Sequence, residues 1–216
     1  MVKPLVLAHR AGPAGRLPEN SLAALRATMR TGADGIEIDV QRSTDGRYFI
    51  CHDPARLPAA SLRRRRLSNG EPVPYLEEFL AAATRGLVFL DLKETCDPVA
   101  VADRALAILP PERLFFSSFW HPGIQELGKR RPGLRIGVTV EARLVRPEEV
   151  LRAAGADVLV LPASCTDRET VARVRRAGGE VWCWGVDDPA AGRGLARFGV
   201  RALVTDHPVR WGATAR

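Results

Sequence analysis

The run Gly35-Ile36-Glu37-Ile38-Asp39-Val40 decides the expected fold. In a β-strand, side chains two residues apart point to the same face, so Glu37 and Asp39 point together while the isoleucines and Val40 point the other way. One face of this strand is therefore apolar and is expected to lie under helices. The other face presents two carboxylates. Such a run indicates a sheet whose outer surface is covered by helices.

Short runs rich in leucine or β-branched residues alternate with longer stretches rich in alanine, arginine and glutamate along the whole chain. This pattern is typical of repeated βα units with a parallel sheet. The eight expected strands are Leu5–His9, Gly35–Val40, Val88–Lys93, Leu114–Ser118, Arg135–Val140, Val158–Leu161, Val181–Val186 and Ala202–Thr205. The expected helices are Asn20–Thr31, Tyr75–Thr84, Pro98–Leu109, Pro122–Arg131, Pro147–Ala154, Asp167–Ala177 and Pro189–Phe198, several of them begun by proline, asparagine or aspartate and followed by glycine.

Eight strands with helices between them predict an α/β fold of the (β/α)₈ TIM-barrel class, in a chain of 216 residues that is somewhat shorter than the usual ~250. A doubly wound open sheet is the alternative, but no G-x-G-x-x-G pattern follows the first strand. A short extra strand, Arg47–Cys51, is expected after the Asp45-Gly46 turn and carries the chain back to His52 at the barrel mouth. The segment from Pro54 to Pro74 lacks periodicity and is expected to be a loop, with four consecutive arginines at 63–66.

Composition favours one globular domain over residues 1–216, because the chain is 46% hydrophobic and too short for two ordinary domains. No apolar run approaches the ~20 residues that span a bilayer, and the first residues become polar too early for a signal peptide, so stable membrane insertion is not expected and a cytoplasmic location is. The four cysteines have neither disulfide-framework nor zinc-site spacing. The net charge of +7 is spread along the chain without a nucleic-acid-binding stripe, so no nucleic-acid partner is expected.

Two carboxylates on one face of a buried strand repel one another unless a cation joins them. A hard divalent ion with oxygen ligands, Mg²⁺ or Ca²⁺, meets that need. Asp91 and Lys93 repeat the two-residue spacing on a later strand, and Asp91 is the third expected metal ligand. Lys93 is one of only three lysines among 32 basic residues, which indicates a specific use of a compact ammonium beside a metal and a phosphate. The alternatives are carboxylates paired with surface arginines, and an Asp91–Lys93 ion pair without a catalytic role.

His9 ends the first strand and His52 follows the extra strand, so both are expected at the same opening, where they fit a general base and a general acid. Arg10 can bind two phosphate oxygens with its fork of donors. Asn20 is expected to cap the helix that follows it.

Four motifs in order, His9-Arg10-Ala11, Pro18-Glu19-Asn20-Ser21, Glu37-Ile38-Asp39 and His52-Asp53, resemble the signature of the glycerophosphodiester phosphodiesterase family. Softer matches follow at Ser117-Ser118-Phe119, Trp184 and Thr205-Asp206-His207-Pro208, so the resemblance covers nearly the whole chain. It implies that His9 takes a proton from the nucleophile and that His52 either protonates the leaving oxygen or binds the metal. It also implies phosphate or substrate contacts from Arg10, Lys93 and Trp184, a metal held by Glu37, Asp39 and Asp91, and a supporting role for Glu19.

Three features depart from the family pattern. Ala11 stands where the family has a glycine, whose freedom to adopt positive φ alanine lacks. Asp91 stands where the family usually has a glutamate, one methylene longer. The insertion that commonly follows the His-Asp pair is cut down to the segment before Pro74.

The function that the resemblance implies is metal-dependent hydrolysis of glycerophosphodiesters to an alcohol and glycerol 3-phosphate, in which the free glycerol hydroxyl can attack phosphorus before water opens the cyclic product. The expected partner is a small-molecule phosphodiester, and the sequence leaves the oligomeric state open. Two alternatives remain: a lysophospholipase D-type or other small-phosphodiester hydrolase, and a non-catalytic barrel that binds anions.

Overall fold

A closed barrel of eight parallel strands forms the centre of the computed structural model, which describes residues 3–12, 17–53 and 56–212. The barrel strands are β1 (Leu5–Ala8), β2 (Gly35–Arg42), β4 (Leu87–Leu92), β5 (Leu114–Ser118), β6 (Ile136–Thr139), β7 (Val158–Pro162), β8 (Glu180–Trp184) and β9 (Ala202–Thr205). Each pairs with its neighbour in parallel, and β1 closes the ring by pairing with both β2 and β9. The predicted (β/α)₈ barrel is confirmed.

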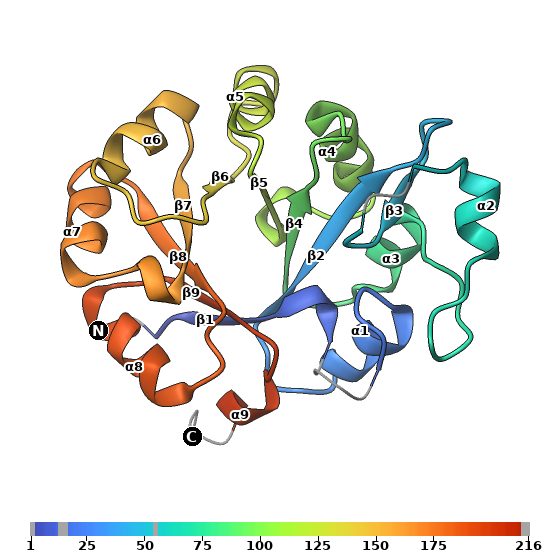
Figure 1. Ribbon diagram of the computed structural model, residues 1–216, viewed down its shortest axis with the longest axis horizontal. Helices are drawn as coiled ribbons and strands as arrows, with labels where there is room; N and C mark the ends of the chain where they lie inside the picture. The colour runs from blue at the N-terminus through green and yellow to red at the C-terminus, as the bar shows by residue number, and fades with distance from the viewer. Residues whose placement is uncertain (1–2, 13–16, 54–55, 213–216) are drawn as a thin grey trace.

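Helices surround the strands (Figure 1): α1 (Leu22–Thr28), α3 (Leu76–Ala82), α4 (Pro98–Leu106), α5 (His121–Arg130), α6 (Pro147–Ala154), α7 (Arg168–Arg176) and α8 (Pro189–Phe198). Each overlaps one of the helices expected from the sequence. The extra strand is also present as β3 (Tyr48–Ile50), which pairs antiparallel with the outer end of β2 and lies outside the ring. None of the helices in the described part of the chain is both long and apolar enough to cross a membrane.

The apolar side chains form two layers, which follow from the alternation along each strand. Ile36 and Ile38 point outward into a large core between the strands and the helices, as predicted. Inward-pointing side chains fill the barrel itself, where the Phe115 ring lies 4.1 Å from the ring of Trp182 and 4.8 Å from that of Phe89, centroid to centroid. Gly137 on β6 leaves room for this stack, because a Cβ there would come within 2.5 Å of the Phe115 ring.

The expected loop between Pro54 and Pro74 is in part a helix, so that prediction was wrong in the part the structure describes, residues 56–74. Helix α2 (Ala59–Arg64) buries Leu62 against Phe49 of β3 and Val73, in a small core of its own. Arg63 holds the helix to α3 through two hydrogen bonds of 2.8 and 2.9 Å to Glu78. A helix of six residues shows too little periodicity to be recognised in the sequence.

A second short helix that the sequence did not predict, α9 (Val209–Gly212), follows β9. Its Trp211 is buried against α8, where a Cβ on Gly192 would come within 2.0 Å of the indole. Short 3-10 turns also occur at η1 (His9–Ala11), η2 (Pro111–Arg113) and η3 (Ala163–Cys165).

Candidate active site

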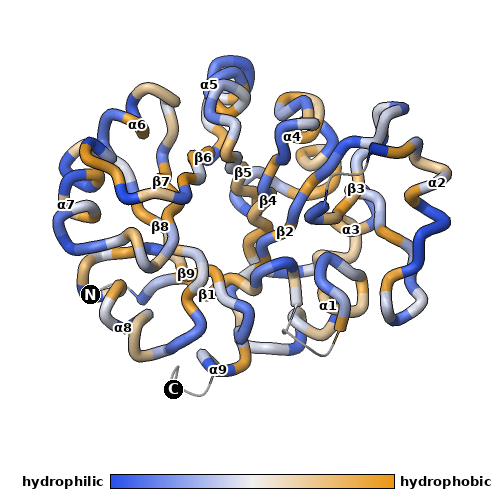
Figure 2. Tube along the Cα trace, viewed as in Figure 1, coloured by the Kyte–Doolittle hydropathy of each residue, from blue (hydrophilic) through white to orange (hydrophobic). Residues whose placement is uncertain are grey.

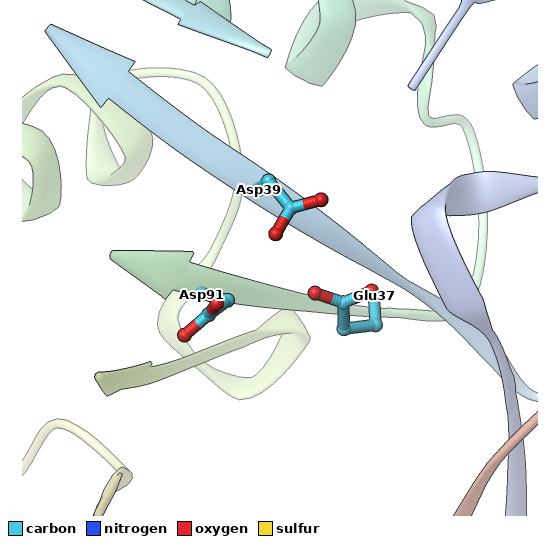
Figure 3. Close-up of side chains that lie close together, drawn as sticks. All are labelled: Glu37, Asp39 and Asp91. Carbon is cyan, nitrogen blue, oxygen red and sulfur yellow. The ribbon is translucent and has the colours of Figure 1, made fainter. Parts of the chain in front are cut away.

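Three carboxylates meet on the neighbouring strands β2 and β4 (Figure 3). Glu37 and Asp39 lie two residues apart on β2, and Asp91 lies directly opposite Asp39 in the parallel pairing of β2 with β4. One oxygen from each carboxylate lies within 4.8 Å of the other two, and all three side chains are buried. The period-two alternation thus brings the three predicted metal ligands to one point.

Lys93 is the cation inside this cluster. Its Nζ lies 2.5 Å from Asp39 Oδ1 and 2.5 Å from Asp91 Oδ2. Burial raises the pKa of Asp39, but the charge and the hydrogen bond of Lys93 outweigh burial and hold that pKa below its ordinary value. Burial and the charge of Asp39 raise the pKa of Glu37 to about 8. One lysine therefore does not balance three buried carboxylates.

The cluster fits a divalent cation by its donor chemistry. Carboxylate oxygens are the ligands that Mg²⁺ and Ca²⁺ prefer. Asp91 Oδ1 is buried and has no hydrogen-bond partner among the described residues, which is costly for a carboxylate unless a further positive group binds it. Asp91, although one methylene shorter than the glutamate expected from the family, still reaches the cluster.

The loop after β1 takes a backbone conformation that favours glycine. Arg10 and Ala11 have φ values of 47° and 59°, so Ala11 does adopt the left-handed conformation that its departure from glycine made doubtful. Each such residue costs about 1–2 kcal/mol. Asn20 N donates to Arg10 O at 2.8 Å and Thr28 Oγ1 donates to Ala11 O at 2.8 Å, which holds the loop in place. The turn aims the Arg10 backbone N–H at Glu37 Oε2, 2.9 Å away.

Glu19 orients the side chain of Arg10. Arg10 Nη1 lies 2.5 Å from Glu19 Oε2, and Arg10 Nε lies 3.4 Å from Asp39 Oδ2. Glu19 is half exposed and lies among the residues of the neighbouring loop rather than in the carboxylate cluster. It therefore positions the guanidinium from outside the cluster.

Asn20 is not the helix cap that the sequence predicted. Ser21 caps α1, since its Oγ accepts from Ala24 N at 3.0 Å. Asn20 instead has a φ of 56° and donates from Nδ2 to Asp39 Oδ2 at 2.8 Å, while its Oδ1 accepts from Asp39 N at 3.3 Å. The amide therefore clamps one carboxylate of the cluster.

The two neighbouring residues are expected to respond differently to substitution. Asn20→Gly keeps the positive φ accessible but removes the amide, so we expect turnover to fall at least about tenfold. Ser21→Ala removes only the cap, so we expect a loss of about 1 kcal/mol in the free energy of unfolding with turnover nearly unchanged. Initial rates and thermal melting of both variants test this, and equal rates for the two would contradict the clamp.

His9 is held by a residue to which the sequence assigned no role. Because Ala8 of β1 pairs with Thr205 of β9, the following residues His9 and Asp206 lie side by side, with 2.6 Å between Nδ1 and Oδ1. Burial lowers the pKa of His9, but the hydrogen bond to Asp206 and the charge of Glu37 outweigh it and raise that pKa above its ordinary value. When Nδ1–H of His9 donates to Asp206, the other ring nitrogen, Nε2, carries a lone pair that can accept a proton. Nε2 lies 3.9 Å from Glu37 Oε2.

Asp206→Asn is expected to lower kcat/KM about 10²-fold, because the amide no longer holds the imidazole or stabilises its protonated form. A base acts in its neutral form, so the rate rises with pH through the pKa of His9. Removing the anion lowers that pKa, so the acid limb of the profile moves to lower pH. Asp103→Asn, at a surface carboxylate paired with Arg131, is the control. An unchanged rate with an unchanged acid limb would count against this role of Asp206.

His52 lies at the same opening, as predicted. Its side chain is about half exposed, with 3.1 Å from Nδ1 to Asp53 Oδ1, and its backbone oxygen accepts from Gln41 Nε2 at 2.9 Å. His9, Arg10, His52, Lys93 and the three carboxylates line one pocket of about 370 Å³. The rest of the lining consists of Thr139, Glu141 and an apolar wall formed by Phe89, Phe119, Val160, Trp184 and Val204.

Trp184 has a buried Nε1–H that meets no acceptor among the described residues, which leaves a donor for a ligand. The cavity therefore combines charged and titratable side chains with an apolar wall. Among the sequence-predicted site residues, only Glu19 lies off this pocket, behind Arg10.

Comparisons with known proteins agree on one family. The glycerophosphoryl diester phosphodiesterase family matches residues 9–210. The chain is 27% identical over 240 residues to the glycerophosphodiester phosphodiesterase of Caldanaerobacter subterraneus subsp. tengcongensis, with 96% of each chain covered.

Solved structures of phosphodiesterases also resemble this chain. An Oleispira antarctica phosphodiesterase in complex with the product sn-glycerol-3-phosphate superposes with a TM-score of 0.85 at 25% identity, covering 98% of this chain and 97% of the other. A glycerophosphodiester phosphodiesterase of Agrobacterium tumefaciens superposes with a TM-score of 0.83 at 26% identity, covering 98% and 100% of the two chains.

Proposed function

The chain belongs to the glycerophosphoryl diester phosphodiesterase family and is a phosphodiester hydrolase, and from this premise we propose that it cleaves glycerophosphodiesters to an alcohol and glycerol 3-phosphate with a bound divalent cation and two histidines. One pocket supports this reaction, because it holds a buried carboxylate triad, a histidine oriented by Asp206, and a second histidine at the rim. The product bound to the Oleispira antarctica relative supports glycerol 3-phosphate as the product here.

Glu37, Asp39 and Asp91 would hold Mg²⁺ or Ca²⁺, which when bound supplies positive charge to a phosphate oxygen. Arg10 and Lys93 bind further phosphate oxygens and balance the charge that develops during cleavage. The apolar wall with the free Trp184 Nε1–H receives the glycerol moiety, whose carbons pack on the rings while a hydroxyl accepts the hydrogen bond.

His9 Nε2 takes the proton from the attacking oxygen, which is either the free glycerol hydroxyl or water. Asp206 holds the resulting imidazolium. His52 donates a proton to the oxygen of the departing alcohol from the solvent side of the pocket. If the glycerol hydroxyl attacks first, water opens the cyclic phosphate in a second step with the same two histidines in exchanged roles.

The test is product analysis with glycerophosphocholine. Purified protein with Mg²⁺ or Ca²⁺ is expected to release choline and glycerol 3-phosphate. Release of glycerol and phosphocholine would show that the other ester bond is cleaved. Turnover confined to lysophosphatidylcholine would favour the lysophospholipase D alternative, and no turnover of either diester by folded, metal-loaded protein would overturn the proposal.

A further inference from the structure

A second pocket adjoins the first and shares two of its functional residues. It measures about 310 Å³ and is lined by Arg10, Glu19, Asn20, Ile50, Cys51, His52, Asp53, Leu62, Arg65, Arg66, Leu67 and Val73. Arg10 and His52 line both cavities. A phosphodiester whose phosphate is held at these two residues can therefore extend one ester arm into each cavity.

We propose that this second pocket receives the departing alcohol, and that Arg65 and Arg66 select alcohols that carry an anionic group of their own, above all a phosphate. The assignment rests on the proposed function, because it takes the glycerol arm to lie against Trp184 in the first pocket. The arm on the other side of the phosphate then extends past His52, the residue that would protonate its oxygen, toward the two arginines.

The two arginines are unpaired cations, unlike their neighbour. Arg63 is bound by Glu78 and by the Val73 carbonyl. Arg65 and Arg66 are exposed and form no ion pair within the described residues. The two acids of the pocket already have partners, since Glu19 binds Arg10 and Asp53 lies beside His52. The part of the pocket rim formed by Arg65 and Arg66 is therefore positively charged. An arginine can bind phosphate through two parallel charge-assisted hydrogen bonds.

The backbone that carries these arginines is fixed. Arg65 follows the last residue of α2 and caps it, its N–H donating to Leu62 O at 3.1 Å. Arg66 forms a β-bridge to Pro72, and Leu67 N donates to Glu71 O at 2.8 Å across the turn between them. Leu62 and Val73 are buried and give the pocket an apolar floor. The carbon chain of an alcohol packs on this floor while its anionic end reaches the guanidinium groups.

Arg64 separates this role from general attraction of anions. In Figure 2 the tube turns blue after the first part of α2, where the arginines follow the apolar start of the helix. Arg64 is exposed, like Arg65 and Arg66. Arg64 does not line the second pocket. Long-range attraction would involve all exposed arginines of the segment alike, whereas binding in the pocket involves only Arg65 and Arg66.

The experiment measures kcat/KM for three diesters with the same glycerol phosphate half: glycerophosphocholine, glycerophosphoglycerol, and glycerophosphoglycerol bearing a terminal phosphate. We expect wild-type protein to prefer the anionic arm over the neutral arm about tenfold, and the cationic arm least. In the double variant Arg65→Gln/Arg66→Gln the anionic-to-neutral ratio is expected to fall to about one, mainly through KM. Arg64→Gln is expected to keep the wild-type ratio.

Equal kcat/KM for the three diesters, or loss of the preference in Arg64→Gln as well, would overturn the inference while leaving the proposed function intact. Non-hydrolysable phosphonate analogues of the same compounds keep the test independent of turnover. If the protein hydrolysed no diester but still bound the anionic analogue most tightly through Arg65 and Arg66, the proposed function would fail and the subsite would stand. Equal binding of the analogues would overturn the subsite.

Discussion

Replacing His9 by alanine is expected to lower kcat about 10³–10⁴-fold, because it removes the pocket histidine whose Nδ1 lies 2.6 Å from Asp206 and whose Nε2 lies 3.9 Å from Glu37. KM is expected to change much less, because in the proposed mechanism Arg10 and Lys93 bind the phosphate and both remain. The measurement is a steady-state assay with glycerophosphocholine at saturating metal.

His121→Gln is the matched control for this substitution. His121 Nε2 lies 3.0 Å from the Thr139 carbonyl, a contact that a glutamine amide can replace. We expect this variant to keep kcat within about twofold. If His9→Ala retained wild-type kcat, or if both variants lost activity alike, His9 would not be the base.

Asp91→Asn is expected to weaken the apparent affinity for Mg²⁺ or Ca²⁺ at least about tenfold and to lower turnover at limiting metal about 10²-fold or more. The substitution keeps the shape of the side chain but removes the charge of the proposed ligand, whose Oδ1 has no hydrogen-bond partner among the described residues. Raising the metal concentration should recover part of the lost rate. That recovery distinguishes a metal ligand from a residue needed only for folding.

Metal titrations of initial rate, with binding followed by calorimetry, measure both quantities. Glu126→Gln, at a surface glutamate 3.6 Å from Arg130, is the control and should behave as wild type. Wild-type metal dependence in Asp91→Asn would exclude this carboxylate as a ligand.

The sequence predicts those parts of the fold and site that depend on local periodicity. The alternation in β2 places Glu37 and Asp39 on one face, and apolar runs of similar length locate the other barrel strands. The local pattern does not predict that Asp91 lies opposite Asp39. That alignment depends on which strands pair: β4 pairs with β2, while β3 lies outside the ring.

Two site residues depend on contacts that a local pattern does not contain. Asp206 reaches His9 only because β9 closes the barrel against β1, at a separation of 197 residues. Its position directly after the last strand was the available signal, since the carboxyl ends of all barrel strands meet at one edge. Asn20 fits the pattern of a helix cap, but its backbone has positive φ and its amide donates to Asp39 instead. Ser21, the next residue, caps the helix.

Helix α2 illustrates a different limit. Six residues give little helical signal, and the helix is stabilised by tertiary contacts of Leu62 and Arg63 rather than by its own propensity. Those contacts also fix Arg65 and Arg66 beside the second pocket, so the same short segment decides the shape of that pocket.

The most direct test of the account is the release of glycerol 3-phosphate from glycerophosphocholine by the same preparation before chelation, after chelation, and after Mg²⁺ or Ca²⁺ is added back. The carboxylate triad predicts that chelation abolishes release and that added metal restores it. Undiminished release by protein shown to be free of metal would contradict a metal-assisted site at Glu37, Asp39 and Asp91.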